Sequence, residues 1–143
     1  MGKAREAADR ITDAILANDY QTLAGLYGTE AVLVDPVAGE VTGEGILQVL
    51  RGFTDAFPQM GYEQIAAYES GDTAIDEGYL VGTNTGPLAL PSGETLAPTG
   101  RQVRVRSCDI LTLKDGRVAS HRFYYDQFEL LSQLGLAPDP ASV

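Results

Sequence analysis

The sequence predicts an α+β fold, in which helices cover one face of a curved antiparallel sheet. Apolar residues recur with helical spacing from Lys3 to Phe57, and alternation typical of strands replaces that spacing after Pro58. Short turns join the later strands, which is the pattern of an antiparallel meander. The chain has 143 residues, and we expect a single domain over residues 1–143.

The N-terminal part of the chain predicts helices around one short strand. Residues 3–17 form the first helix, because their apolar residues make one stripe, and Asp19 can cap a short second helix. Residues 31–35 form a strand that Pro36 ends. Residues 43–57 form the clearest amphipathic helix, whose apolar face consists of Ile46, Val49, Leu50, Phe53 and Phe57.

The chain after Pro58 predicts strands, with tight turns after the first and third of them. The expected strands are residues 62–69, 74–85, 101–113 and 118–125. Asp115-Gly116 favours a two-residue hairpin, which pairs Leu113 with Val118. Residues of one parity then share a face of the sheet.

Counting back from this hairpin predicts which side chains face the helices. The expected cross-strand pairs are Asp109–Arg122, Ser107–Tyr124 and Val105–Asp126. A face with these polar groups suits a pocket, which needs apolar walls and a few convergent polar groups. The opposite face includes His121 and is expected to meet solvent or a second subunit.

The composition disfavours several classes of function. The formal net charge is −10, and phosphate binding needs a basic patch, so we expect no nucleic acid partner. The single cysteine and single histidine make a cysteine- or histidine-based metal site unexpected. No apolar run approaches the roughly 20 residues of a membrane helix. The N-terminus lacks an apolar signal core, so we expect a cytoplasmic protein with no membrane partner.

The C-terminal half carries short motifs in a characteristic order. They are GTNTG (82–86), PTGR (98–101), CDI (108–110), KDGRV (114–118), YYDQ (124–127) and LLSQLG (130–135). In this order they resemble the SnoaL-like polyketide cyclases. That family belongs to the nuclear transport factor 2-like superfamily, which also includes ketosteroid isomerase and limonene-epoxide hydrolase.

The resemblance implies a cone-shaped α+β barrel, in which the sheet wraps around the N-terminal helices and leaves an internal cavity. It implies a homodimer, which we expect to form through the outer face of the sheet. It also implies an enzyme without a cofactor, in which a pocket aspartate is general acid and base for an intramolecular aldol ring closure. Asp126 matches that aspartate, and the expected substrate is small, apolar and carbonyl-bearing.

Asp126 has two explanations that the sequence leaves open. Residues 126–129 also fit a capping box, with Asp126 at the N-cap of a helix and Glu129 at its third position. Asp126 can therefore cap the helix, act in catalysis, or do both.

Asp109 and Arg122 have two explanations as well. They form a structural ion pair, or they join Asp126 in an Asp–Arg–Asp set. Limonene-epoxide hydrolase-like enzymes use those residue types to open epoxides, so an epoxide-bearing substrate is the alternative. Tyr124 is either a packed aromatic or a donor to an enolate oxygen. The candidates for substrate binding are Asn84, Ser107, Asp35, Tyr20, Phe53 and Leu88.

The segment 86–98 contains three leucines between glycines and prolines. An apolar loop of this length needs a surface to cover, so we expect a lid over the pocket mouth or a contact with a second subunit. The sequence thus leaves three functions open: a cyclase or isomerase, an epoxide hydrolase or epoxide-opening cyclase, and a non-catalytic ligand-binding or dimerisation module.

Overall fold

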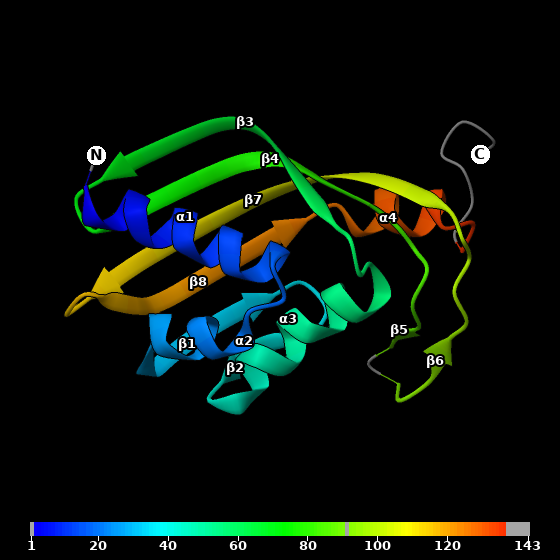
Figure 1. The fold of residues 1–143 in the computed structure, drawn as a ribbon, viewed down its shortest axis with the longest axis horizontal. Coiled ribbons are helices and arrows are strands. Elements are labelled where there is room, and N and C mark those ends of the chain that lie inside the picture. Colours follow the sequence, from blue (N-terminus) through cyan, green and yellow to red (C-terminus); the bar gives the residue numbers. More distant parts are fainter. Residues whose placement is uncertain (1, 91, 137–143) are drawn as a thin grey trace.

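The computed structural model describes residues 2–90 and 92–136, and Figure 1 shows its helices along one face of a long, curved sheet. The helices are α1 (Lys3–Leu16), α2 (Tyr20–Leu26), α3 (Glu44–Ala56) and α4 (Gln127–Gln133). The strands are β1 (Tyr27–Asp35), β2 (Gly39–Thr42), β3 (Gly61–Ser70), β4 (Thr73–Thr83), β5 (Leu88–Ala89), β6 (Thr95–Leu96), β7 (Gln102–Lys114) and β8 (Arg117–Tyr125). The predicted fold class, an α+β fold with a curved sheet beside N-terminal helices, is confirmed.

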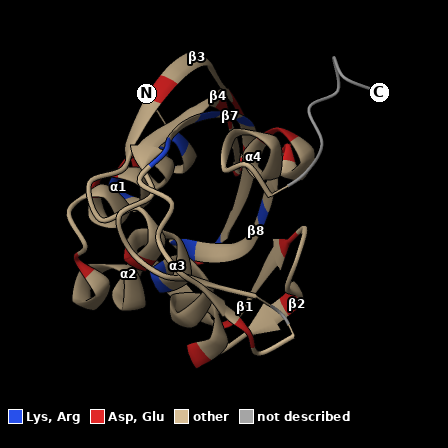
Figure 2. Ribbon diagram, turned by 90° about the vertical axis from the view of Figure 1, so that its right-hand side faces the viewer, with Lys and Arg blue, Asp and Glu red and all other residues tan. Residues whose placement is uncertain are grey.

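The main sheet has the strand order β2-β1-β8-β7-β4-β3, and β5 pairs with β6 in a separate ribbon. Neighbouring strands in the sheet are antiparallel except for β1 and β8, which are parallel. The prediction of a wholly antiparallel sheet is wrong at this pair. The long connection through α3 and the β3–β4–β7 meander brings β8 back beside β1 in the same direction. Figure 2 shows the sheet curving around α1 and α3.

Helices α1 and α3 cover the concave face of the sheet (Figure 1). The buried stripe of α1 is mainly alanine, and it packs against β3, β4 and β7. Ile46 and Leu50 of α3 join the same apolar core, as the predicted amphipathic face requires. The site described below therefore lies in an interior enclosed by α1, α3 and the sheet.

The turn between β7 and β8 forms as predicted. Asp115 has φ 55° and Gly116 has φ 79°, and a type I′ turn needs positive φ at both central residues. Leu113 pairs with Val118 beside the turn. A β-bulge follows at once, because Thr112 pairs with Ser120 and leaves Ala119 without a partner on β7.

The bulge exchanges the two faces of β8 relative to the prediction. Asp109 lies opposite Phe123, not opposite Arg122. A shift of one residue moves every later side chain to the other face of a strand. His121 and Phe123 therefore face the helices, whereas Arg122 and Tyr124 lie on the outer face. The predicted inward placement of Arg122 and Tyr124 is wrong, because the count from the turn assumed a regular ladder.

The short helix α4 follows β8 in the chain and lies beside β7. Asp126 caps it, since its carboxylate accepts a hydrogen bond from the Glu129 N–H at 2.9 Å. Glu129 accepts from the backbone N–H of Arg106 at 2.7 Å. Gln133, one turn later, bonds both the N–H and the C=O of Arg104, at 2.6 and 2.9 Å. Side chains of α4 thus make the hydrogen bonds to the β7 backbone that a neighbouring strand would otherwise make.

Residues 86–90 and 92–98 leave the sheet and include the paired strands β5 and β6, which lie beside the end of α3 (Figure 1). Asn84 holds the base of this ribbon. Its amide nitrogen donates to the carbonyls of Ala56 and Gly86, and its oxygen accepts from the N–H and hydroxyl of Thr99. Asn84 was a predicted substrate ligand, but these bonds use the donors and acceptors of its side chain.

The outer surface carries acidic residues and some exposed apolar residues. Figure 2 shows acidic residues on both the helical layer and the sheet. Ile65, Tyr68 and Tyr124 are exposed on β3 and β8. Pairing of two copies through the outer face of the sheet stays a prediction. Across residues 2–90 and 92–136, no helix has the length and apolar character to cross a membrane.

Candidate active site

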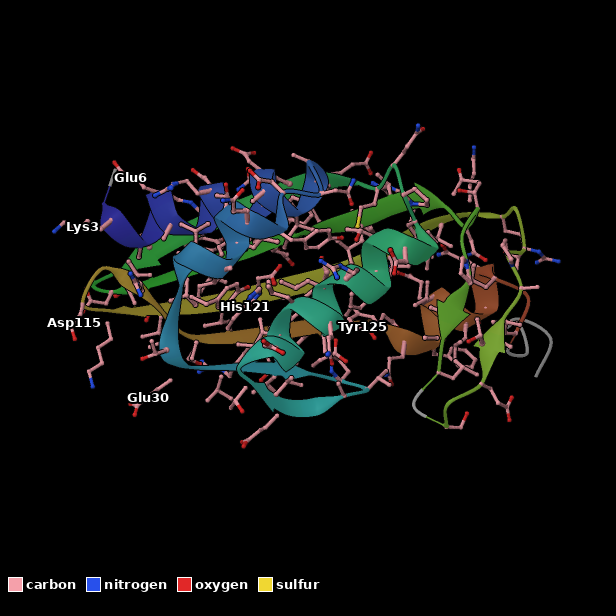
Figure 3. All side chains as sticks on the ribbon, turned by 60° about the horizontal axis from the view of Figure 1, so that its bottom comes forward. Lys3, Glu6, Glu30, Asp115, His121 and Tyr125 are labelled. Carbon is pink, nitrogen blue, oxygen red and sulfur yellow. The ribbon has the colours of Figure 1, made fainter. Side chains whose placement is uncertain are left out.

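An internal cavity of about 60 Å³ lies between the sheet and helices α1 and α3. Its apolar wall includes Ile15, Leu16, Leu50, Phe53, Met60, Leu80 and Phe123. Tyr62, Asp109 and His121 supply polar groups to the same wall, so we call this space the polar cavity. Figure 3 shows His121 in the interior, between the sheet and the helices. Apolar walls with a few convergent polar groups are typical of ligand sites.

Asp109, His121 and Tyr27 form a hydrogen-bonded chain at this wall. Asp109 Oδ1 lies 2.6 Å from His121 Nε2, and Tyr27 Oη lies 2.8 Å from His121 Nδ1. Burial, and then the charge of Asp109, raise the pKa of Tyr27 well above its ordinary value, so its phenol keeps its proton. A phenol that donates to Nδ1 leaves the proton of a neutral imidazole on Nε2, where it is donated to Asp109.

Tyr62 of β3 lines the polar cavity. Its hydroxyl is buried and has no hydrogen-bond partner among the described residues. Burial raises the pKa of Tyr62 far above its ordinary value, and the charges of Asp109 and Asp76 add to that rise. Gly78 makes room for the ring, since a Cβ there would lie 2.6 Å from the hydroxyl oxygen. A buried polar group without a partner needs an explanation, and a bound ligand supplies one.

Asp76 is a second acid beside Asp109, and its charge is compensated. The two residues are partners across β4 and β7. Arg5 of α1 bonds both carboxylate oxygens of Asp76, at 2.8 and 2.6 Å, and Gln64 donates to one of them. Asp109 instead has an imidazole as its partner and faces the cavity. Of the two acids, Asp109 is therefore the one placed to exchange a proton with a ligand.

The sequence profile of the family described as SnoaL-like domain matches residues 8–121. This range includes most of α1, all of α2 and α3, and every residue that lines the polar cavity except Phe123. The chain belongs to the SnoaL-like domain family. A comparison with the curated proteins finds no match.

Solved structures share the fold of this SnoaL-like domain at low sequence identity. A protein from Jannaschia sp. CCS1, proposed to be a SnoaL-like polyketide cyclase, is 19% identical, with 95% of this chain and 94% of that chain covered and a TM-score of 0.82. AclR from Streptomyces galilaeus, proposed to be a hydroxylase, is 21% identical, with 96% and 87% covered and a TM-score of 0.78. An LEH-like epoxide hydrolase of M. tuberculosis is 16% identical, with 92% and 89% covered and a TM-score of 0.68.

Three predicted site residues of this SnoaL-like domain face its interior as expected. Asp109 and Phe53 line the polar cavity. Ser107 is buried on the same face of β7, and its hydroxyl donates to the Gly78 carbonyl at 3.4 Å. These placements hold because β7 itself is regular, and the bulge lies on the partner strand.

Asp126 lies at the start of α4 with an exposed side chain, not in the polar cavity. Its predicted place opposite Val105 is wrong, because the bulge pairs Ser107 with Tyr125 and ends the ladder there. The capping explanation is confirmed by the hydrogen bond from Glu129. Arg122 and Tyr124 likewise stay outside the cavity, and Tyr124 is 46% exposed.

The remaining candidates contact the helices and the core. The Tyr20 hydroxyl bonds the Thr54 hydroxyl and ties α2 to α3, with the Arg51 guanidinium 4.4 Å from its ring centre. Leu88 packs on the apolar cluster near the end of α3. Neither side chain is among those that line the polar cavity.

Asp35 is buried on the inner face of β1. Its Oδ2 accepts from the N–H groups of Val37 and Ala38, at 2.9 Å each. Its Oδ1 is buried and lacks a partner among the described residues. Burial, and then the charge of Asp35, raise the pKa of Tyr125 to about 12. Asp35 is thus a further buried acid to test.

The prediction did not identify His121 and Tyr62 as residues of the site. His121 was assigned to the outer face, and the bulge that reverses this has no glycine or other marker at Ala119. Among the described residues, no group of three or more His, Cys, Asp or Glu side chains is placed to hold a metal ion.

Proposed function

We propose that this SnoaL-like domain is an enzyme that closes a ring in an apolar, carbonyl-bearing, polyketide-like substrate by general acid–base catalysis without a cofactor. Membership of the family and the likeness to the Jannaschia protein support the reaction class. The observation that carries the proposal is the Asp109 carboxylate, held by buried His121 on the wall of the polar cavity. Tyr62 lines the same cavity, and its buried hydroxyl has no partner among the described residues.

The groups have complementary roles in an aldol closure. Asp109 removes a proton from the carbon beside a carbonyl, and the Tyr62 hydroxyl donates to the oxygen where enolate charge develops. The enolate carbon attacks a second carbonyl of the same substrate, and one carbon–carbon bond forms. Asp109 then returns its proton to the new alkoxide, so atoms and charge balance.

His121 and Tyr27 position the base. Both ring nitrogens of His121 are bonded, so the imidazole cannot turn away from Asp109 without breaking a buried hydrogen bond. A substrate that fills this cavity would displace water from it, which would strengthen the electrostatic interactions of the bound enolate.

The epoxide alternative has less support from the geometry. It required Arg122 and Asp126 beside Asp109, and the structure places Arg122 on the outer face and Asp126 in an exposed cap. The likeness to the epoxide hydrolase, at 16% identity, is a likeness of fold.

Exchange of α-protons in deuterated water tests the base without the natural substrate. The probe is 2-tetralone, and loss of its α-proton NMR signals measures enolisation. We expect Asp109→Asn to slow exchange by about 10²–10⁴-fold, the usual contribution of a general base. Tyr62→Phe should slow it by a smaller factor, because the base remains and one oxyanion donor is lost.

Asp126→Asn is the matched control, since it makes the same chemical change at an exposed cap and should exchange at the wild-type rate. Full activity of Asp109→Asn would contradict the proposal. Loss of activity in Asp35→Asn instead would move the base to Asp35. No exchange by the wild type above the buffer rate would favour a non-catalytic binding module.

A further inference from the structure

A second cavity of about 20 Å³ lies next to the polar cavity. Its walls are almost wholly apolar, and Phe57, Val103, Val105 and Leu130 are among the residues that line only this space, which we call the apolar cavity. Phe53, Met60 and Leu80 line both cavities. These shared residues form the wall between the two spaces.

Phe53 is the central residue of that wall. Its ring centre lies 5.5 Å from that of Phe123, which lines the polar cavity. It lies 5.4 Å from that of Tyr125, which lines the apolar cavity. Both contacts are edge-to-face, so one aromatic residue from each cavity holds the Phe53 ring. Figure 3 shows His121 and Tyr125 well apart along this interior.

The packing around Phe53 is unlike that of an ordinary core residue. Phe57, the residue that follows α3, is buried with 5% exposure, whereas Phe53 is only half-buried and borders hollow space on two sides. Protein interiors usually fill space as densely as organic crystals. A ring placed between two unfilled spaces divides them, and its removal would join them.

We infer that Phe53 divides one elongated ligand site and limits the length of the ligand that the protein accepts. The orientation of the ligand rests on the proposed function: its carbonyl lies near Asp109 and Tyr62, and its tail points toward the apolar cavity. Each cavity is well below the roughly 300 Å³ at which ligand sites usually begin. A longer tail must therefore displace the Phe53 ring. The favoured substrate class is a carbonyl compound with an unbranched apolar tail.

Binding of methyl ketones of increasing length, from 2-butanone to 2-dodecanone, tests this inference. Met60 lines both cavities and is one of two methionines in the chain, so a ¹³C-methyl methionine label reports on both by NMR titration. In the wild type, affinity should stop rising once the tail reaches Phe53. In Phe53→Ala it should continue to rise over further carbons, by about fourfold per methylene.

Three variants separate this effect from others. Leu130→Ala enlarges the apolar cavity and leaves the wall, so it should keep the wild-type length profile. Phe53→Leu keeps part of the wall and should give an intermediate profile, and it carries the test if Phe53→Ala does not fold. Asp109→Asn removes the proposed base but not the wall, so it should also keep the wild-type profile.

Equal length profiles for the wild type and both Phe53 variants would overturn the inference. So would an equal extension in Leu130→Ala, or the absence of ketone binding to any of these proteins. Loss of α-proton exchange in Asp109→Asn together with equal profiles would leave the proposed function standing and remove the role of Phe53.

Discussion

At the residue scale, the site depends on how one imidazole is held. His121 is 2% exposed, bonds Tyr27 and Asp109 through its two nitrogens, and stacks with the Tyr27 ring at 6.1 Å between centroids. The orientation of Asp109 toward the cavity is therefore coupled to a phenol on another strand. Neither partner can be altered without leaving a buried polar atom unpaired.

Tyr27→Phe removes the hydroxyl that bonds His121 Nδ1 and keeps the ring. We expect the free energy of unfolding to fall by about 1–3 kcal/mol, because a buried acceptor loses its partner. Urea denaturation measures the change, and Tyr68→Phe at an exposed position is the control. The chain has one histidine, so its ¹⁵N spectrum is unambiguous and should show a protonated Nε2 in the wild type. Equal stability of the two variants would contradict the hydrogen-bonded chain.

Cys108, on the opposite face of β7 from Asp109, provides a test of pH dependence. Burial, followed by the charges of Asp109, Glu77 and Asp76, raises the pKa of the Cys108 thiol. The thiolate is the reactive form, so less of it exists at pH 8 than in an unperturbed cysteine. Alkylation by iodoacetamide should be slower than that of a model peptide, and its rate should rise only at higher pH.

Mass spectrometry reads this reaction at a single site, since the chain has one cysteine. Glu77→Gln removes one of the negative charges and should shift the rate profile back toward lower pH. A profile equal to that of the peptide would contradict the raised pKa.

At the scale of elements, a bulge decides which β8 side chains face the interior, and a short helix covers the free edge of β7. The extra residue Ala119 turns the His121 side chain toward the interior. Because β8 ends first, α4 and not a strand lies beside the remaining part of β7. Glu129 and Gln133 satisfy the backbone of that exposed edge. The cap at Asp126 therefore supports the edge of the sheet as well as the helix.

Asp126→Ala should lower the free energy of unfolding by about 1 kcal/mol, the usual effect of losing an N-cap. Asp126→Asn should cost less, because asparagine is also a good N-cap. Urea denaturation of the two variants checks the difference. A cost for Asp126→Asn equal to that of Asp126→Ala would point to a role for the charge that capping alone does not explain.

At the scale of the whole molecule, one buried ion pair joins the helical layer to the sheet. Arg5 of α1 and Asp76 of β4 have side chains that are 11% and 6% exposed. Charges this deeply buried stabilise only as a pair, since each alone would lose its hydration without compensation. The pair fixes the position of α1 over the polar cavity, next to Asp109.

Arg5→Ala leaves Asp76 uncompensated and should destabilise the fold by about 3–5 kcal/mol. The double variant Arg5→Met with Asp76→Leu replaces both charges by apolar groups and should recover most of that loss. Thermal unfolding of the two variants gives the comparison. A double variant as unstable as Arg5→Ala would mean that the pair is not the main link between α1 and the sheet.

The sequence by itself determined the fold class, because apolar periodicity and turn residues act locally. The stripe on α1, the amphipathic face of α3, and the Asp115-Gly116 turn were each predicted and observed. The inward face of β7, with Asp109 on it, followed from the same alternation. The family resemblance found in the C-terminal motifs agrees with the match over residues 8–121.

Only the tertiary structure decided the site. The bulge at Ala119 depends on how β8 fits between β7 and β1, and neither neighbour is local in the sequence. It reversed Arg122, Tyr124 and His121, because a strand has a period of two and one added residue exchanges its faces. The partners Tyr27 and Tyr62 come from distant strands. The spacing of residues along the chain does not predict these long-range contacts.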